Sequence, residues 1–329
     1  MLQRYLIIWL SATSLAAFYW PSWFPNVPDP FTATTQHALW ALIVITMFCI
    51  GLMLPAHEVR QVFSRWPTVF GGTAIQYLSM PLLAFAIGNL LGLQGGYLTG
   101  VVLVGCVPGA MASNVLTLNA RGNASYSVSL TTAATLVSPL AVPLALGLTL
   151  QSWGWSQVGK LIDSGIFLSW AVVLPVVIGH LFARLLPQAT VWFKRLAPQL
   201  ANLAILWIIA AIVGQTRTQI ADLSWIILAA LLTINLGGYF AGFFGATAMR
   251  LDIPMRRALT LEVGMQNAGL GTTLAKALFP DQAEIWVAPA LYTFGCMLTG
   301  TLLAWFWSRR AEAAKNPAPA KPATGPSEL

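Results

Sequence analysis

The sequence predicts an all-α membrane protein that crosses the bilayer many times. Of its 329 residues 57% are hydrophobic and only 8% are charged, and the mean hydropathy is +0.72. Several apolar runs are longer than the roughly 18 residues that mark a membrane-spanning helix. A soluble domain could not cover this much apolar surface, so we expect a polytopic helical protein.

Ten apolar segments follow one another along the chain, separated by short loops that hold most of the charges. Each segment is long enough for one membrane-spanning helix. The predicted spans are residues 3–20, 37–54, 68–92, 96–120, 125–150, 159–183, 199–216, 223–249, 255–279 and 284–308.

The distribution of positive charge predicts the orientation. If the N-terminus lies in the cytoplasm, only Lys160, Arg217 and Lys276 of the 17 Lys and Arg residues fall on the outside. Such a bias predicts that both termini are cytoplasmic. The first span could instead be a secretory signal peptide, but the nine spans that remained would weaken the charge bias.

The remaining composition excludes several classes of protein. Residues 309–329 are rich in Ala, Pro, Lys and Ser, so we expect a disordered cytoplasmic tail. The formal net charge of +7 lies in short loops, which form no basic patch for nucleic acid. Cys49, Cys106 and Cys296 lie in apolar runs at unrelated spacings and form no CxxC metal or redox motif.

The ten spans divide into two sets of five. Because each set has an odd number of spans, the second set crosses the membrane in the opposite orientation to the first. Inverted repeats of this kind are typical of transporters. The fourth span of each half has a glycine-interrupted polar stretch that contains an Asn, Asn114 or Asn267. The third spans have the mid-span amides Gln76 and Asn235.

Glu262 is the only acidic residue in the middle of a predicted span. An ionised side chain at that depth costs at least about 2.5 to 3.5 kcal/mol, so we expect it to have a partner and a function. No Lys or Arg lies at comparable depth in another span, whereas Gln, Asn, Ser and Thr recur at mid-span in the fourth, fifth and ninth spans. This pattern predicts a small bound cation.

Two spans are predicted to be interrupted helices. In the fourth, Pro108 removes a backbone donor and Gly109 adds freedom. In the ninth, Gly264, Gly269 and Gly271 surround the polar residues. A proline alone often makes only a kink that neighbouring helices stabilise. Two interruptions at corresponding places in the two halves, however, indicate a transport site.

Hydroxyl and amide oxygens near the interruptions complete a set of cation ligands. Ser127 and Thr131 stand four residues apart and share one helix face, although each hydroxyl could bond to its own helix instead. Together with Ser113, Asn114 and Glu262 they offer only oxygen, which suits a hard cation and not zinc or copper. One carboxylate balances one monovalent charge, so sodium fits better than calcium.

The interruptions also expose the N-terminal ends of two half-helices. Free amides and the helix dipole favour anions there. These amides belong to residues 110–112 and 267–269. We therefore expect an anionic substrate between the two half-helices, and a transported amine would contradict this expectation.

Three stretches resemble signature segments of the bile acid:sodium symporter family, in its bacterial branch. They are Pro108–Asn114 (PGAMASN), Arg121–Asn123 (RGN) and Glu262–Leu270 (EVGMQNAGL). The likeness extends over almost the whole chain up to about residue 308. For residues 1–308 it implies a panel domain of spans 1, 2, 6 and 7 and a core domain of spans 3 to 5 and 8 to 10, whose broken fourth and ninth helices cross.

The resemblance also implies a function, two sodium ions and their ligands. The function is sodium-driven uptake of an organic monocarboxylate across a bacterial inner membrane, and we expect a monomer. The first ion would be held by Ser113, Asn114, Ser127, Thr131 and Glu262. The second would be held by Gln76, Glu262, the backbone carbonyls of Val263 and Met265, and the side chain of Gln266. The substrate would contact Ala110, Met111, Ala112, Asn267, Ala268, Cys296 and Met297.

The chain departs from the family's pattern in the substrate region. Many members have Gly-Thr where this sequence has Ala110-Met111, and a His-Asn pair where it has Cys296-Met297. Both changes make the substrate cavity less polar. A bile acid, a pantoate-like acid and a keto acid all stay open as substrates.

Three other functions compete with sodium-coupled transport. A buried Glu262 could carry protons, although a proton needs no surrounding set of oxygens. A channel would need a continuous polar pore, whereas the polar residues here cluster at one depth. An intramembrane enzyme has little support, because the sequence has no HExxH, no GxSxG and no second intramembrane acid. We therefore expect no enzymatic activity and no organic cofactor.

Overall fold

The computed structural model describes residues 6–55, 62, 64–150 and 158–315. All regular structure in these residues is helical, which confirms the predicted all-α class. A helix occupies each of the ten predicted segments, and seven helices among the described residues are long and apolar enough to cross a membrane. The count of ten crossings and the inverted repeat stay predictions.

The first five predicted spans contain six helices. They are α1 (Leu6–Trp23), α2 (Gln36–Met53), α4 (Trp66–Leu90), α5 (Gly95–Cys106), α6 (Ala112–Asn119) and α7 (Ala124–Thr149). The fourth span is interrupted between α5 and α6, where Pro108 and Gly109 lie.

The last five predicted spans contain a π-helical turn and a second interruption. The helices are α8 (Val158–Leu168), the π-helical turn η3 (Ser169–Val173), α9 (Leu174–Leu185), α10 (Pro187–Gln215), α11 (Arg217–Ala221), α12 (Trp225–Ala248), α13 (Ile253–Gly264), α14 (Ala268–Leu278) and α15 (Ala283–Lys315). The ninth span is interrupted between α13 and α14. Helix α15 continues past the predicted boundary at residue 308, and residues 316–329 of the predicted tail lie outside the described residues.

Polar side chains cap the N-terminal ends of several helices. Thr35 caps α2, Asn123 caps α7, Ser224 caps α12 and Asp252 caps α13, each by accepting a hydrogen bond from an amide of the first turn. Such caps satisfy donors that the helix itself leaves free. The caps therefore explain why these helices begin where they do.

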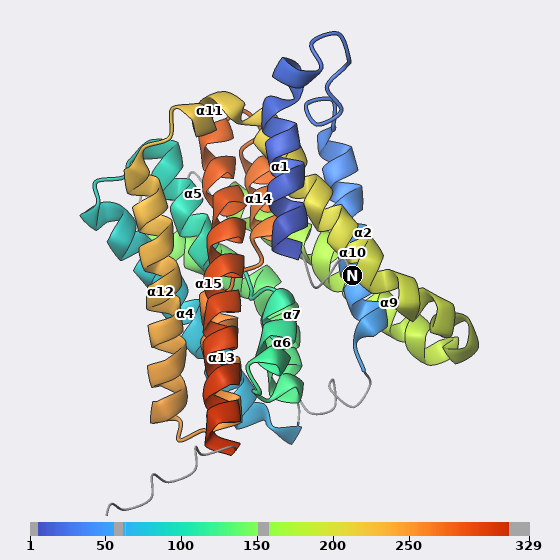
Figure 1. Ribbon diagram of the computed structural model, residues 1–329, viewed down its shortest axis with the longest axis vertical. Helices are drawn as coiled ribbons and strands as arrows, with labels where there is room; N and C mark the ends of the chain where they lie inside the picture. Colours follow the sequence, from blue (N-terminus) through green and yellow to red (C-terminus); the bar gives the residue numbers. More distant parts are fainter. Residues whose placement is uncertain (1–5, 56–61, 63, 151–157, 316–329) are drawn as a thin grey trace, which may run out of the picture.

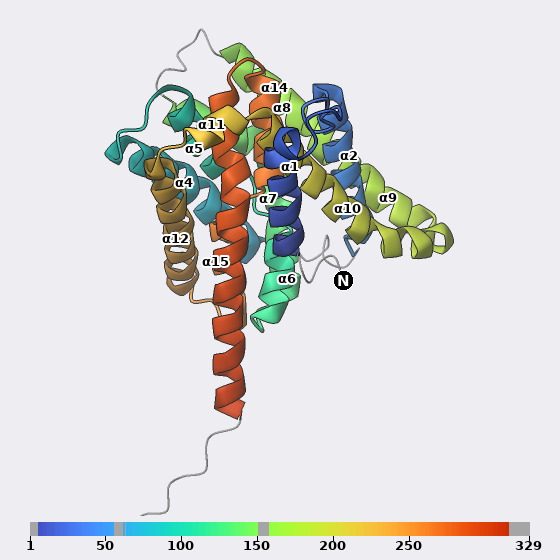
Figure 2. The same ribbon diagram turned by 45° about the horizontal axis from the view of Figure 1, so that its top comes forward.

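The helices pack in two groups (Figures 1 and 2). Helices α1, α2, α9 and α10 contact one another and form the α2/α10 group. Helices α4, α5, α6, α7, α12, α13, α14 and α15 pack together and form the α4/α12 group. An apolar cluster fills the boundary, with Leu39 and Ile212 from the first group and Leu103 and Leu274 from the second side.

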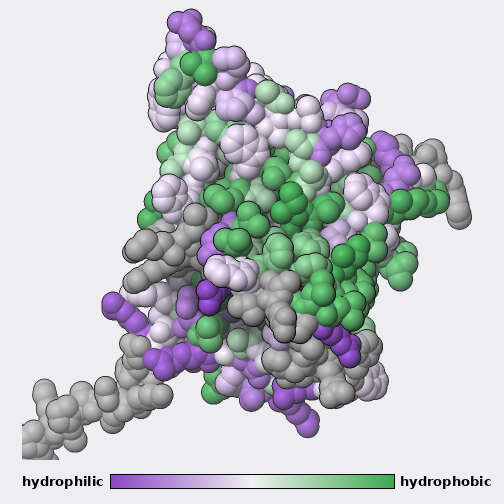
Figure 3. Space-filling view, turned by 90° about the vertical axis from the view of Figure 1, so that its right-hand side faces the viewer, coloured by the Kyte–Doolittle hydropathy of each residue, from purple (hydrophilic) through white to green (hydrophobic). Residues whose placement is uncertain are grey.

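The helices end at two opposite faces of the molecule. The Lys276 face is the one at which α1 and α14 end and α2 begins, and the Arg257 face is the opposite one. Figure 3 shows hydrophobic side chains across the middle of one side of the molecule, with hydrophilic ones gathered at its upper and lower ends. This is the distribution expected of a membrane protein. The Arg257 face is the one predicted to be cytoplasmic.

Helix α15, with 33 residues, is the longest helix that the structure describes. Figure 2 shows its C-terminal end extending beyond the other helices at the Arg257 face. Near this end the Arg309 guanidinium lies 4.4 Å from the Trp305 ring centroid, and the Arg257 guanidinium lies 5.8 Å from the Trp307 ring centroid. Such pairs of aromatic and basic residues are typical of the boundary between membrane and water.

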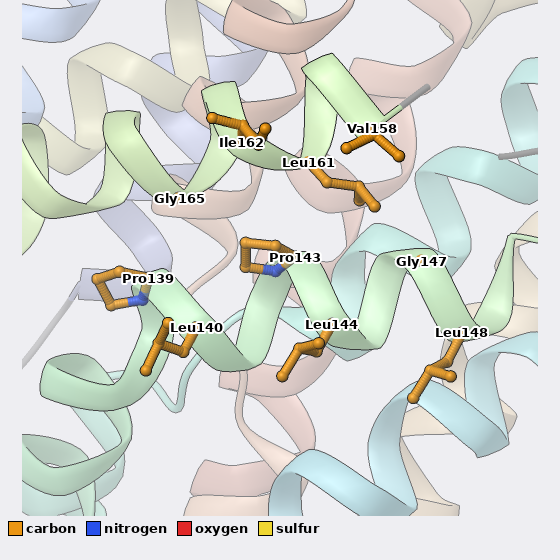
Figure 4. Close-up of a pocket in the computed structure, with 10 residues that line it drawn as sticks. All are labelled: Pro139, Leu140, Pro143, Leu144, Gly147, Leu148, Val158, Leu161, Ile162 and Gly165. Carbon is orange, nitrogen blue, oxygen red and sulfur yellow. The ribbon is translucent and has the colours of Figure 1, made fainter. Parts of the chain in front are cut away.

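A groove of about 730 Å³ lies between α7 and α8 (Figure 4). Its lining is apolar and includes Pro139, Pro143, Leu144 and Leu148. Leu144 and Leu148 are also exposed on the outer surface of the helices. The groove suits the hydrocarbon chains of a bilayer, and no polar side chain of the described residues lines it.

Helices α2 and α9 approach each other so closely that the contact requires glycine on both sides. A Cβ atom on Gly51 would lie 2.1 Å from the Val176 carbonyl oxygen, and one on Gly179 would lie 2.3 Å from the Phe48 carbonyl oxygen. Small residues let two helix backbones meet in a membrane. This contact therefore fixes how α9 packs in the α2/α10 group.

Gly51→Val should lower the thermal unfolding temperature of the detergent-purified protein. The added side chain must push α2 away from α9, and overpacking typically costs about 1–3 kcal/mol. Gly159→Val in α8 is the matched control, because no atom of the described residues lies within 4 Å of its Cβ position. A Gly51→Val protein as stable as the wild type would contradict the close packing of α2 and α9.

Candidate functional site

The two interrupted helices cross, and their unwound segments bond to each other. The Ala110 N–H donates to the Met265 carbonyl oxygen, and the Asn267 N–H donates to the Pro108 carbonyl oxygen, both at 2.8 Å. The pairing forms a short antiparallel bridge. Inside a membrane every backbone polar group needs a partner from the protein. The two interruptions therefore satisfy each other, and we call this pairing the crossing.

Glu262 lies two residues before the end of α13, and its side chain is fully buried. Its Oε2 accepts hydrogen bonds from Ser113 Oγ at 2.5 Å and from Thr131 Oγ1 at 2.8 Å. Its Oε1 has no hydrogen-bond partner among the described residues. The carboxylate packs over Gly109, where a Cβ atom would lie 2.1 Å from Oε1.

Amide and hydroxyl groups extend this cluster away from the carboxylate. Asn114 Oδ1 accepts a hydrogen bond from Ser127 Oγ at 2.7 Å and lies 3.3 Å from Thr131 Oγ1. Thr117, which the sequence analysis did not select, places its Oγ1 3.3 Å from Ser127 Oγ. Helices α6, α7 and α13 therefore bring the five residues of the first predicted sodium set together.

The second predicted sodium set lies on the α4 side of the crossing. Gln76 is 1% exposed, and its Nε2 donates to Gln266 Oε1 at 3.2 Å. The Nε2 of Gln266 donates to the Val263 carbonyl oxygen at 2.9 Å. The Met265 carbonyl takes part in the crossing itself, and the Glu262 carboxylate is bonded to the first set. The structure thus joins three of these residues directly.

The residues predicted to contact the substrate differ in burial. The half-buried ones are Ala110, Met111, Ala112, Asn267 and Met297, and the buried ones are Ala268 and Cys296. The Asn267 side chain caps α14 by accepting a hydrogen bond from the Leu270 N–H at 3.1 Å, whereas α6 begins without a side-chain cap. Of the two half-helices, α6 is therefore the one that begins without a side-chain cap. Among the amides predicted to be free, those of Ala110, Asn267 and Ala268 already donate to backbone carbonyl oxygens.

A polar network behind the crossing was missed by the sequence analysis. Asn235 Nδ2 and the Tyr292 hydroxyl both donate to the Gly264 carbonyl oxygen at 2.8 Å. Thr299 Oγ1 donates to Asn235 Oδ1 at 2.7 Å, and the Tyr239 hydroxyl lies 3.0 Å from Thr299 Oγ1. The network satisfies the last carbonyl of α13. Only the mid-span amide of Asn235 was visible as a signal in the sequence.

Comparison with known proteins gives a consistent result. The Sodium Bile acid symporter family matches residues 40–223. The uncharacterized sodium-dependent transporter YocS of Bacillus subtilis (strain 168) is 32% identical over 306 residues, which cover 93% of this chain and 91% of the relative. The probable sodium/metabolite cotransporter BASS1, chloroplastic, of Arabidopsis thaliana is 28% identical over 92% of this chain and 73% of the relative. The ileal sodium/bile acid cotransporter of Mus musculus is 28% identical over 85% and 81%.

The fold and the site define a helical multi-pass membrane protein with a buried oxygen cluster at the crossing of two interrupted helices. The chain belongs to the sodium bile acid symporter family, as its motifs indicated. This is a family of sodium-coupled transporters of organic anions or metabolites. Its members compared above are named as transporters or cotransporters.

Gly109→Ala should destabilise the protein, because the new methyl group would overlap Glu262 Oε1 and push the carboxylate off Ser113 and Thr131. Overpacking of this kind costs about 1–3 kcal/mol. Thermal unfolding in detergent measures the loss. Gly269→Ala in the other interrupted helix is the matched control, because the atoms nearest its Cβ position lie at 3.8 and 3.9 Å. Equal stability of the two variants would contradict the close contact between Gly109 and Glu262.

Proposed function

We propose that this chain is a secondary active symporter of a bacterial cytoplasmic membrane. It couples inward sodium flow to the uptake of an organic monocarboxylate by alternating access. The observation that carries the proposal is the buried Glu262 carboxylate, with one unpartnered oxygen and hydroxyl and amide oxygens from α6 and α7 around the other. A buried carboxylate of this kind needs a cation.

Sodium ions are carried with the substrate, and their inward flow drives the uptake. The cluster offers ligands for two of these ions. One ion takes oxygens of Ser113, Asn114, Ser127, Thr131 and Glu262. A second ion takes Glu262, the side chains of Gln76 and Gln266, and the carbonyls of Val263 and Met265. The unpartnered Oε1 of Glu262 and the purely oxygen donor set support this assignment, since a hard cation prefers oxygen ligands.

The substrate is an organic monocarboxylate that binds at the crossing. The uncapped N-terminal end of α6 offers amide donors and a positive dipole end to a carboxylate. Asn114 Nδ2 also has no hydrogen-bond partner among the described residues. Met111 and Met297 make the surroundings apolar, which suits the body of a bile acid-like, pantoate-like or keto acid. Relatives named as sodium/bile acid and sodium/metabolite cotransporters support this class.

Alternating access follows from the two helix groups. In this proposal the α2/α10 group is the panel and the α4/α12 group is the core, which shifts against it. Helix α14 contacts α2 and α10 near the Lys276 face, whereas α6 and α13 pack mainly within the α4/α12 group. This arrangement supports a state closed toward the outside. Two sodium ions with one monovalent anion move one net positive charge, worth about 2.3 kcal/mol per 100 mV of membrane potential.

Proton coupling through Glu262 is the second candidate. The unpartnered Oε1 favours it, because a protonated carboxyl group needs no cation. The donor set around Oε2 favours sodium, because a proton needs no group of converging oxygens. A direct comparison of sodium and pH separates the two candidates.

Sodium should raise the thermal stability of the wild-type protein, whereas equal potassium or choline should not. At a sodium concentration one hundred times its dissociation constant, the gain is about 2.7 kcal/mol for one site. Glu262→Gln should lose the gain, because the neutral amide no longer balances the ion. The measurement is thermal unfolding in detergent at fixed pH. A wild type that responds to pH alone, with no response in Glu262→Gln, would favour proton coupling and contradict the sodium proposal.

Ser127→Ala and Gln76→Ala should each weaken only one of the two sodium sites. Each variant removes an oxygen ligand from one set and leaves the other set intact. Isothermal titration with sodium chloride should therefore resolve one weakened site and one site of wild-type affinity in each variant. Equal weakening of both sites by either substitution would contradict the division into two sites.

A further inference from the structure

Lys276 connects the two helix groups at the Lys276 face. It is half-buried in the last turn of α14. Its ammonium group donates to Gln215 Oε1 at the end of α10 and lies 4.9 Å from the Trp286 ring centroid of α15. The side chain therefore lies where the α2/α10 group meets α14 and α15.

Gln215 is held so that its oxygen faces Lys276. Its Nε2 donates to the carbonyl oxygens of Phe31 at 3.2 Å and Thr34 at 2.9 Å, both in the loop between α1 and α2. The amide nitrogen has two N–H donors, and both are used by these carbonyls. Only Oε1 remains for Lys276.

Among the described residues, the charge of Lys276 has no acidic partner. Within the part of the chain that the structure describes, Lys276 makes no ion pair, whereas Arg217 pairs with Asp29 at 2.5 Å. The acceptor of Lys276 is a neutral amide. A carboxylate adds an opposite full charge to a hydrogen bond whose donor is already ionised, so it attracts the ammonium group more strongly than the amide oxygen does. An organic anion that reaches this point can therefore displace Gln215.

Few other cations on this face could receive an anion. The Lys160 ammonium lies 4.8 Å from the Phe279 ring centroid, and Arg217 is occupied by Asp29. The acidic residues predicted for the outside outnumber the three cations, so the face as a whole does not attract anions. They are Asp29, Asp163, Asp222, Asp281 and Glu284.

We propose that Lys276 receives the anionic substrate at the outer entrance, by exchanging its hydrogen bond with Gln215 for one with the substrate carboxylate. The inference rests on the proposed function, because it takes the Lys276 face as the outside and the substrate as an anion. The exchange selects for negative charge before the substrate reaches the crossing. It also breaks a contact between the two helix groups, so that arrival of the anion favours separation of the groups on this face.

The test uses Gln215→Cys, which places a thiol beside Lys276. Right-side-out vesicles are treated with anionic methanethiosulfonate ethylsulfonate or cationic methanethiosulfonate ethyltrimethylammonium, and the two labelling rates are compared. Wild-type vesicles give the background, since Cys49, Cys106 and Cys296 are buried. Adding Lys276→Gln should lower the ratio of the anionic to the cationic rate by roughly tenfold. The anionic reagent loses its attraction to the ammonium group at about 6 Å, and the cationic reagent loses its repulsion at the same distance.

Lys160→Gln in the Gln215→Cys background is the matched control. It removes the same charge from another lysine of this face and should change the ratio by much less. An equal fall with Lys160→Gln would assign the effect to the whole face and overturn the proposal. Absence of labelling of Gln215→Cys by either reagent would also overturn it, because Lys276 would then be out of reach of an external anion.

A salt series tests the same charge without a second substitution. Raising choline chloride from 0.1 to 1 M shortens the screening length from about 10 to about 3 Å. The rate ratio of Gln215→Cys alone should therefore fall toward the value measured with Lys276→Gln. A ratio that does not depend on salt would overturn the role of the Lys276 charge.

Sodium-dependent thermal stability separates this inference from the proposed function. Lys276→Gln should keep the full sodium response, because Lys276 is not one of the proposed sodium ligands. A preserved sodium response with an unchanged reagent ratio would overturn the inference alone. A wild type without any sodium response would overturn the proposed function, whatever the reagent ratio.

Discussion

The two hydrogen bonds of the crossing hold the rest of the site in place. A helix that stops inside a membrane leaves amides and carbonyls that water cannot reach. Here residues 108–110 and 265–267 supply each other with the missing partners. Because the segments are paired, Ser113 of α6 lies against Glu262 of α13, and α7 adds its hydroxyl groups from the side. Local backbone chemistry thus brings together side chains about 150 positions apart in the sequence.

The two ends of the crossing are supported differently. On one side Gln76 of α4 bonds to Gln266, and on the other Asn235 of α12 and Tyr292 of α15 bond to the Gly264 carbonyl. The first contact is between side chains and can rearrange, whereas the second fixes a backbone carbonyl. The α12 side therefore holds the backbone of α13, whereas the α4 side contacts the crossing through side chains.

Much of the fold could be predicted because burial in a membrane is so costly for polar groups. The apolar segments located the helices. Glu262 was identified as a functional residue because an ionised side chain at that depth is costly unless it has a partner. The interruptions were harder to predict, since Pro81, Pro139 and Pro289 all lie inside continuous helices. Pro108 differs because a glycine follows it and a second unwound segment lies opposite.

The partners of the crossing could not be predicted from the sequence. Tyr292 and Thr299 have no spacing that marks them, since a tyrosine or threonine in an apolar helix usually packs or bonds to its own backbone. Thr117 matters only because of what the fold places beside it. Residue types therefore predicted the kind of ligand that the site could bind. The packing of α12 and α15 determined which backbone carbonyl of α13 is hydrogen-bonded.

The length of α15 affects how the protein sits in its membrane. Its 33 residues correspond to about 50 Å at 1.5 Å per residue, against a hydrocarbon thickness of about 30 Å. The arginines that lie over the rings of Trp305 and Trp307 indicate that the helix leaves the bilayer near these residues. A helix longer than the hydrocarbon core is accommodated by tilting or by projecting into water, so we expect the surplus length of α15 to project beyond the tryptophans at the Arg257 face.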